Sequence, residues 1–150
     1  MKIWSISNQK GGVGKTTSVV SLGGLLADQG HRVLLVDLDP HGSLTSYFGQ
    51  DPDGLERSLY HLFFEQRWRN VDYIRDTLKP TSLANVSMLP ATTSLATLER
   101  QVSGQDGMGL VLARSLAQLW DDYDYALLDT PPILGVLLVN ALAACQQLVI

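Results

Sequence analysis

A glycine-rich segment, Lys10-Gly11-Gly12-Val13-Gly14-Lys15-Thr16-Thr17, lies between an apolar segment and an amphipathic one. Three of its first five residues are glycines, so the backbone can turn tightly and point successive N–H groups toward one anion. A helix that starts at about Lys15 would add its positive N-terminal end to the same site. We therefore interpret this stretch as a phosphate-binding loop.

The loop follows the pattern G-x-x-x-x-G-K-[ST] from Gly14 onward, but Gln9 replaces the usual first glycine. In this pattern Lys15 reaches the β- and γ-phosphates, and the Thr16 hydroxyl binds Mg²⁺. An extra lysine, Lys10, lies just inside the loop, although a mononucleotide needs only one. The alternative is a glycine-rich turn that binds nothing; the expected strand before it, the expected helix after it and the Lys-Thr pair argue against that alternative.

The composition is that of one globular domain. The chain has 150 residues, of which 45% are apolar and 17% are charged, and its net charge is −4. No run of Lys or Arg indicates a nucleic-acid surface. The single cysteine, Cys145, excludes an internal disulfide and a Cys-cluster metal site, and we expect it to be a small buried side chain. We expect a cytoplasmic protein, because no signal peptide is evident and the apolar run 133–145 is too short to span a bilayer.

The first forty residues predict a β-α-β unit. Residues 3–7 predict a strand, residues 15–29 predict a helix that stops at Gly30, and the apolar run 32–37 predicts a strand buried on both faces. Gly23 and Gly24 weaken the helix, so we expect that they allow close packing against the sheet. This order predicts an α/β fold with a mostly parallel central sheet and a right-handed crossover.

Further elements are expected along the rest of the chain. Hydrophobic periodicity predicts helices over residues 54–66, 71–78, 94–102, 110–120 and 136–145, and strands over residues 86–89 and 125–129. Another apolar strand begins at Leu148 and the sequence then stops, so we expect a C-terminally truncated chain. Arg67-Trp68-Arg69 could contact nucleic acid, but flanking acidic residues favour an exposed loop with a packed tryptophan.

Two acidic segments are expected to converge on the loop. Asp37 and Asp39 leave the second strand, and Asp129 ends the strand 125–129. Loops at the carboxyl ends of parallel strands line one crevice, where ligands bind. Asp129, after four strand residues, has the Walker B form and can hold Mg²⁺ through a water. Asp37 and Asp39 alternate along an extended segment, so one could face the Mg²⁺ shell and the other the attacking water.

The motifs together resemble the deviant Walker A ATPases of the ParA/Soj/MinD group. The resemblance rests on Lys10–Thr17, on Asp37-Leu-Asp-Pro40 and on Tyr123-Asp-Tyr-Ala-Leu-Leu-Asp-Thr-Pro-Pro132, in family order and spacing from residue 1 to residue 150. Pro40 is typical of the ParA/Soj branch. The resemblance implies a three-layer P-loop NTPase fold, of which residues 1–150 would be the N-terminal part, with ATP and Mg²⁺ as cofactors.

The resemblance also implies roles for individual residues. Lys10 would reach the partner's nucleotide in an ATP-sandwich homodimer, and Asp39 would position the attacking water. The implied residue sets are Lys10, Lys15 and Asp39 for catalysis; Lys10, Gly11, Gly12, Val13, Gly14, Lys15, Thr16 and Thr17 for nucleotide binding; Thr16, Asp39 and Asp129 for Mg²⁺, partly through water; and Asp37, Pro40, Thr130 and Pro131 for the switch. His41 departs from the family, which usually has Gln at this position.

Several functions fit the resemblance. The first is an ATP-dependent dimerisation switch that partitions DNA or positions cargo such as polar chemosensory arrays, with slow hydrolysis stimulated by a ParB-like partner and with DNA binding through residues beyond 150. The alternatives are a MinD-like membrane-associated ATPase and a nucleotide-binding scaffold without turnover. An iron–sulfur relative would need paired cysteines, and a dehydrogenase would need a third glycine at Thr17.

Overall fold

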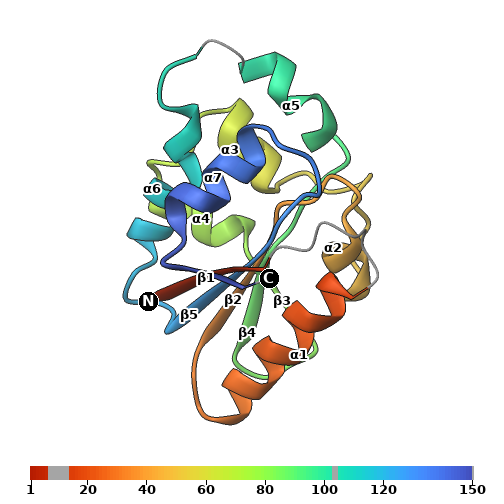
Figure 1. Cartoon of the computed structure of the whole chain (residues 1–150), viewed down its shortest axis with the longest axis vertical. Helices are drawn as coiled ribbons and strands as arrows, with labels where there is room; N and C mark the ends of the chain where they lie inside the picture. Colours follow the sequence, from red (N-terminus) through yellow and green to blue (C-terminus); the bar gives the residue numbers. More distant parts are fainter. Residues whose placement is uncertain (7–13, 103–104, 150) are drawn as a thin grey trace.

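The fold belongs to the α/β class and has a single β-sheet that is covered by helices on both faces (Figure 1). The computed structural model describes residues 1–6, 14–102 and 105–149. Within them the sheet has six strands in the order β3-β4-β2-β5-β1-β6, and all neighbouring pairs are parallel except β3 with β4. The strands are β1 (Lys2–Ile6), β2 (Val33–Asp37), β3 (Lys79–Pro80), β4 (Val86–Leu89), β5 (Tyr125–Asp129) and β6 (Gln147–Val149).

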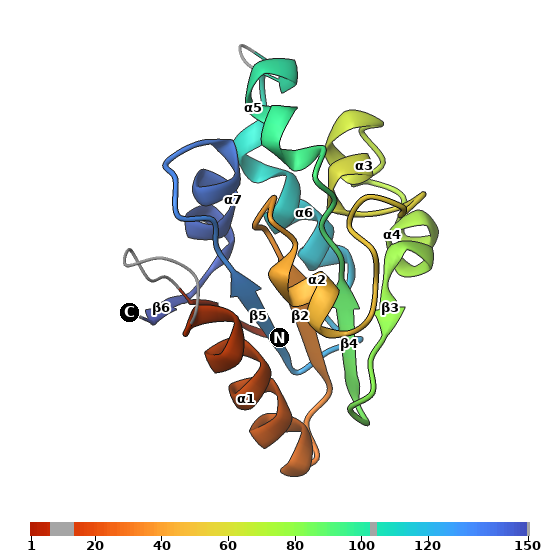
Figure 2. The ribbon, with the colours of Figure 1, turned by 90° about the vertical axis from the view of Figure 1, so that its right-hand side faces the viewer.

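The helices divide between the two faces of the sheet. Helix α1 lies against one face, while α3, α4, α5, α6 and α7 cover the other (Figure 2). The bounds are α1 (Lys15–Asp28), α2 (Ser43–Tyr47), α3 (Leu59–Phe64), α4 (Val71–Thr77), α5 (Leu95–Val102), the 3₁₀ turn η1 (Met108–Leu110), α6 (Val111–Gln118) and α7 (Val136–Ala144). The predicted three-layer α/β fold with a mostly parallel sheet is therefore confirmed.

Alternation along β2 explains why its first four residues, Val33 to Val36, are all apolar. Val33 and Leu35 pack in the cluster under α1, while Leu34 and Val36 pack in the cluster under α3–α7. Successive strand side chains point to opposite faces, so a strand with helices on both faces needs an unbroken apolar run. All five residues of β2 are buried.

The glycines of α1 differ in their packing. A Cβ at Gly23 would lie 3.0 Å from Leu35 Cδ2, whereas a Cβ at Gly24 would find its nearest neighbour, Leu83 Cδ1, at 3.9 Å. The expectation of close packing therefore holds for Gly23 and is wrong for Gly24. Gly30, with φ +90°, follows the helix end in the left-handed conformation.

Most predicted elements are confirmed to within one or two residues, but two expectations need correction and short elements were missed. The helix expected over residues 54–66 is only α3, because residues 52–54 form a turn and the Ser58 side chain caps the helix by accepting from Tyr60 N. The short α2 and the antiparallel edge strand β3 were not predicted. Cys145 is half-buried rather than buried, and its partial burial raises the pKa of its thiol.

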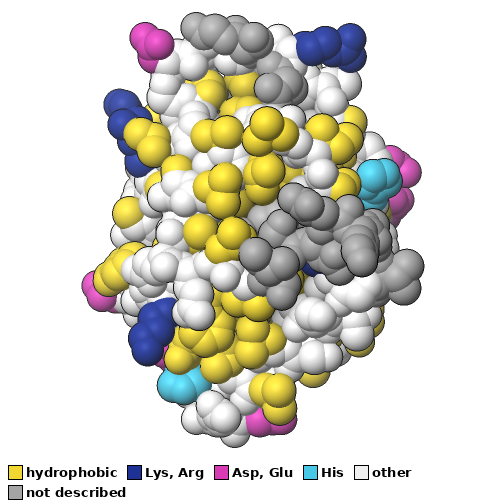
Figure 3. All heavy atoms as spheres, in the orientation of Figure 1, with side chains coloured by type: hydrophobic (Ala, Val, Ile, Leu, Met, Phe, Trp, Pro, Cys, Tyr) yellow, Lys and Arg dark blue, Asp and Glu magenta, His cyan; other side chains and the backbone are white. Residues whose placement is uncertain are grey.

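Two other expectations concern the surface. Trp68 is packed, with the guanidinium of Arg69 4.4 Å from its ring centroid, as the interpretation of a packed tryptophan required. Helix α7 is apolar nearly all round, and its side chains Val139 and Leu142 are exposed. Hydrophobic side chains gather over the region of α7 in Figure 3. Among the described residues, each helix falls short of the length and apolar character that a bilayer crossing requires.

Candidate functional site

Three strand ends meet at the carboxyl edge of the sheet. Asp129 is the register partner of Ile6 on β1 and of Asp37 on β2. The main chain beyond these strands is fixed as well, because Leu38 N donates to Asp129 O at 2.9 Å and Thr130 Oγ1 donates to Ile6 O at 2.7 Å. The expected convergence of the two acidic segments is thus present, and the first turn of α1 lies beside it.

Lys15 is the centre of this convergence. Its side chain is only 5% exposed, and its Nζ lies 2.9 Å from Asp129 Oδ1 and 3.6 Å from Asp39 Oδ2. The same ammonium donates to the main-chain oxygen of Thr130. A buried lysine needs such partners, because an uncompensated charge would be expensive to bury. The ammonium is therefore surrounded by anionic and polar oxygens from the ends of β2 and β5.

Thr16 joins the same group from the first turn of α1. Its Oγ1 donates to Asp129 Oδ2 at 3.0 Å, so the two carboxylate oxygens of Asp129 face Thr16 and Lys15 separately. Burial raises the pKa of Asp129, while the hydrogen bond and charge of Lys15 oppose this rise. A hydroxyl and two carboxylates thus lie within reach of one ammonium.

Asp37 has a different environment from Asp39. It is fully buried, and its Oδ2 accepts from both Thr45 N at 2.9 Å and Thr45 Oγ1 at 2.6 Å. Its Oδ1 accepts from Asp39 N at 3.1 Å, and Thr45 Oγ1 accepts in turn from Ala91 N at 2.9 Å. Burial raises the pKa of Asp37 to about 7, although the Thr45 hydrogen bond lowers it. Asp37 therefore ties β2 to α2 and to the segment after β4.

The sequence suggested that one of the two aspartates would face the Mg²⁺ shell and the other the attacking water, and the environment of Asp37 fits this expectation only in part. They do point in different directions, but every oxygen of Asp37 is engaged by main-chain or Thr45 donors. Asp37 thus has no oxygen turned toward Lys15, whereas Asp39 has one. A supporting role for Asp37 in the predicted switch segment fits this geometry better than a place in the Mg²⁺ shell.

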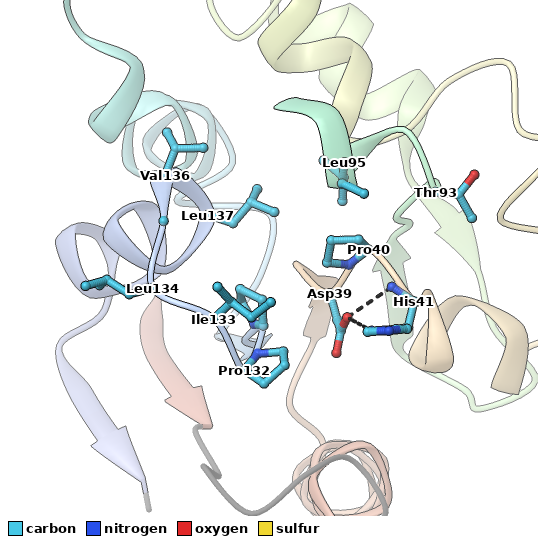
Figure 4. A pocket seen from close by; sticks show the side chains of 13 residues that line it. Asp39, Pro40, His41, Thr93, Leu95, Pro132, Ile133, Leu134, Val136 and Leu137 are labelled. Atoms are coloured by element: carbon cyan, nitrogen blue, oxygen red, sulfur yellow. Dashed lines mark hydrogen bonds and ion pairs between the residues drawn. The ribbon is translucent and has the colours of Figure 1, made fainter. Parts of the chain in front are cut away.

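Asp39 begins a tight turn. Gly42 N donates to Asp39 O at 2.9 Å, and Asp39 Oδ1 accepts from His41 N at 3.0 Å. The ring nitrogen His41 Nδ1 lies 2.8 Å from the same Oδ1 (Figure 4). Gly42 has φ +66°, and a Cβ there would lie 2.6 Å from Pro52 Cγ. Only glycine fits that position, so the turn after Pro40 has a fixed shape.

A cavity of about 670 Å³ opens beside this turn. Its walls come from the Asp39–His41 turn, from residues 93–96 at the start of α5 and from residues 131–137 before and within α7 (Figure 4). Ile133 and Leu134 are 73% and 79% exposed at its rim. The predicted switch residues Pro40 and Pro131 thus line the same cavity.

Apart from the predicted switch residues Asp37, Pro40 and Pro131, which are described above, the predicted site residues fall into three groups. Lys15, Thr16, Asp39, Asp129 and Thr130 lie together, and Gly14 caps α1 while accepting from Ser18 N and Ser18 Oγ. Thr17 is exposed on α1. Lys10, Gly11, Gly12 and Val13 lie outside the described residues, so their roles stay predictions. Sequence reasoning missed Thr45, and its only signal was a short hydroxyl-bearing segment after Gly42.

Comparison with known proteins agrees with the motifs and the fold. A family model described as an AAA domain matches residues 1–150. The chain is 42% identical over 149 residues to the sporulation initiation inhibitor protein Soj of Bacillus subtilis, and 40% identical to the chromosome partitioning protein ParA of Myxococcus xanthus. The chain belongs to the Soj/ParA-like family of P-loop ATPases. Each alignment covers 99% of this chain, but only 57% of Soj and 51% of ParA.

This Soj/ParA-like chain is similar in structure to a protein that was solved with a bound nucleotide analogue. The crystal structure of cobyrinic acid a,c-diamide synthase from Mycobacterium smegmatis, with a bound ATP analogue and magnesium, superposes with a TM-score of 0.89 and is 40% identical. That match covers 99% of this chain and 58% of the other. The Soj/ParA-like chain thus spans little more than half the length of each of these three proteins.

Proposed function

We propose that this chain is the nucleotide-binding part of a partitioning or positioning ATPase, in which Mg²⁺ and ATP drive formation of a homodimer. The observation that carries the proposal is the position of Lys15, a residue of the predicted phosphate-binding motif, which is buried between Asp129 and Asp39. An ammonium held there by hydrogen bonds and ion pairs can exchange its carboxylate partners for phosphate oxygens, since both are anionic oxygen acceptors.

The residues around Lys15 fit a magnesium nucleotide. Mg²⁺ in nucleotide sites takes one or two protein oxygens, several waters and the phosphates, rather than an all-protein cage. The Thr16 hydroxyl and the Asp129 carboxylate supply such oxygens, and the described residues contain no cluster of three or more acidic, His or Cys side chains that would form a cage. When bound, Mg²⁺ would neutralise charge on the transferred phosphoryl group.

Each remaining residue of the site has a defined task in this proposal. Lys15 binds the β- and γ-phosphates, and Asp39 orients the attacking water with the carboxylate oxygen that faces Lys15. Asp37 holds the switch segment through Thr45. Lys10 and the other residues outside the described part are proposed to complete the phosphate site, with Lys10 reaching across the dimer to the partner's nucleotide.

The biological role extends the same proposal. A nucleotide-dependent dimer can bind a matrix and release it after hydrolysis, because contacts to the γ-phosphate bias one state over the other. We propose that a ParB-like partner stimulates slow turnover in the cytoplasm, near the nucleoid or a cell pole, and that the cargo is DNA or a protein array. DNA binding would use parts of the protein outside residues 1–150.

ATP turnover by the full-length protein tests the enzymatic part directly. We expect magnesium-dependent release of phosphate from ATP, loss of nucleotide binding in Lys15→Ala, and retained binding with abolished turnover in Asp39→Ala. Equilibrium binding of a fluorescent ATP analogue separates the two variants. Tight ATP binding by the wild type without any phosphate release, even with candidate partner proteins added, would favour the non-hydrolysing scaffold instead.

A further inference from the structure

The side chain of His41 is the feature of the site that the family pattern leaves without a role. Its ring is 77% exposed, so packing contributes little to its placement. It nevertheless lies against Asp39, with Nδ1 2.8 Å from Oδ1, and Figure 4 shows the ring beside the carboxylate at the edge of the cavity. Among the described residues, the contact with Asp39 is the only side-chain hydrogen bond of His41.

The two oxygens of Asp39 have separate partners. Oδ1 meets both the main-chain N–H and the ring Nδ1 of His41, at 3.0 and 2.8 Å. Oδ2 faces Lys15 Nζ at 3.6 Å. An ionised carboxylate only accepts hydrogen bonds, so the proton between Asp39 and the ring belongs to Nδ1. The second ring nitrogen, Nε2, then has no part in holding Asp39.

The main-chain conformation of this turn positions the His41 ring next to Asp39. A hydrogen bond from Gly42 N to Asp39 O closes the turn. Pro52 occupies the space that a side chain at position 42 would need. Any residue other than proline at position 41 would supply the N–H that bonds Oδ1. The hydrogen bond from Nδ1 is therefore what the histidine side chain adds.

We propose that His41 is a positioning residue for Asp39, which fixes Oδ1 and so keeps Oδ2 directed toward the phosphate side of the site. This inference rests on the proposed function, because it assumes that Asp39 orients the attacking water. Two hydrogen bonds to one oxygen restrict rotation of the carboxylate more than one bond does, and catalysis depends on such orientation. His41 is not itself the base, since it bonds the oxygen that does not face Lys15.

Steady-state ATP turnover of the full-length protein tests the inference. We expect His41→Ala to lower kcat about five-fold while KM for ATP stays within about two-fold, the effect of losing one solvent-exposed hydrogen bond. His41→Gln should restore kcat to within about two-fold of wild type, because an amide N–H can also donate to Oδ1. The matched control is His31→Ala, since His31 packs edge-on against Tyr125, outside the site.

The outcomes separate this inference from the proposed function. Wild-type kcat in His41→Ala, a change in KM alone, or a His41→Gln variant as slow as His41→Ala would each overturn the positioning role. Undiminished turnover in Asp39→Ala would instead contradict the proposed role of Asp39. A second readout needs no turnover: ¹⁵N NMR of the histidine ring should show the Nδ1–H tautomer for His41, and the Nε2–H tautomer would overturn the inference.

Discussion

Lys15 Nζ lies 2.9 Å from Asp129 Oδ1 at a point where both side chains are withdrawn from solvent. The pair joins the first turn of α1 to the carboxyl end of β5, two elements that are more than a hundred residues apart in the sequence. It also holds Lys15, the lysine proposed to bind phosphate, among carboxylates, so nucleotide binding at this position would have to replace existing contacts. The stability of the fold and the chemistry of the site are therefore coupled through one ammonium group.

The first prediction follows from that coupling. In the full-length protein, Lys15→Ala leaves the buried Asp129 carboxylate without its counter-charge, so we expect the free energy of unfolding to fall by about 3 kcal/mol at pH 8. The loss should be smaller at pH 5. Burial raises the pKa of Asp129, so its carboxylate takes up a proton more readily as the pH falls, and protonation removes the unpaired charge. Urea unfolding at both pH values measures this, with the exposed Arg100→Ala as the control. Equal losses at the two pH values would contradict the expectation.

A second prediction concerns Asp37, whose pKa is raised to about 7 by burial. A carboxyl group with a raised folded-state pKa contributes stability that is complete below its unfolded pKa and is lost as the pH rises through 7. Between pH 5 and pH 8 this contribution should fall by about 2–3 kcal/mol in the wild type. Asp37→Asn removes the titrating group, so its unfolding free energy should vary less over that range. Parallel pH profiles for the two proteins would refute the assignment.

Thr45 gives a third prediction, at a residue that sequence reasoning did not identify. Thr45→Val keeps the branched shape but removes the hydroxyl that bonds both Asp37 Oδ2 and Ala91 N. We expect the unfolding free energy to drop by about 1–3 kcal/mol, since two buried polar groups lose a partner. Thr93→Val is the matched control, because its hydroxyl bonds Asp53 at the surface and its loss should cost no more than about 0.5 kcal/mol. Equal effects in the two variants would show that the Thr45 hydroxyl does not stabilise the predicted switch residue Asp37.

The adjacent glycines of α1 provide a fourth, paired prediction. Gly24→Ala meets no close neighbour and gains helix propensity, so it should stabilise the protein by about 0.5–1 kcal/mol. Gly23→Ala places a methyl group 3.0 Å from Leu35 Cδ2, and the resulting crowding should cancel most of the same gain. Differential scanning calorimetry of the two variants compares them directly. A larger gain for Gly23→Ala than for Gly24→Ala would show that the helix packs differently on the sheet.

Periodicity and motif order predicted the sheet, its parallel direction and the convergence of Asp37, Asp39 and Asp129, because these depend on local patterns and on general rules for crossovers. Elements whose stability comes from distant partners were missed. Helix α2 is five residues long and is fixed by the bond from Thr45 to Asp37, and β3 is a two-residue edge that pairs with β4. No sequence period identifies such short segments, since tertiary contacts stabilise them.

The site shows the same division. Residue types and spacing placed Lys15 and Thr16 beside Asp129, because the carboxyl ends of neighbouring parallel strands share one edge. The individual pairings could not be predicted in this way. The engagement of Asp37 with Thr45 and the contact between His41 and Asp39 depend on the shape of one turn, which Gly42 and Pro52 determine together. Such contacts follow from packing rather than from pattern.

Nucleotide state is proposed to control dimerisation, and analytical ultracentrifugation of the full-length protein measures the mass of the assembly in each state. With Mg²⁺ and ATP, the Asp39→Ala variant should sediment as a dimer, because hydrolysis no longer dissolves it, and with ADP it should sediment as a monomer. Adding Lys10→Ala should leave it monomeric with ATP while nucleotide binding persists. A mass that is the same with ATP and ADP, or an unchanged dimer in the Lys10→Ala variant, would contradict the account.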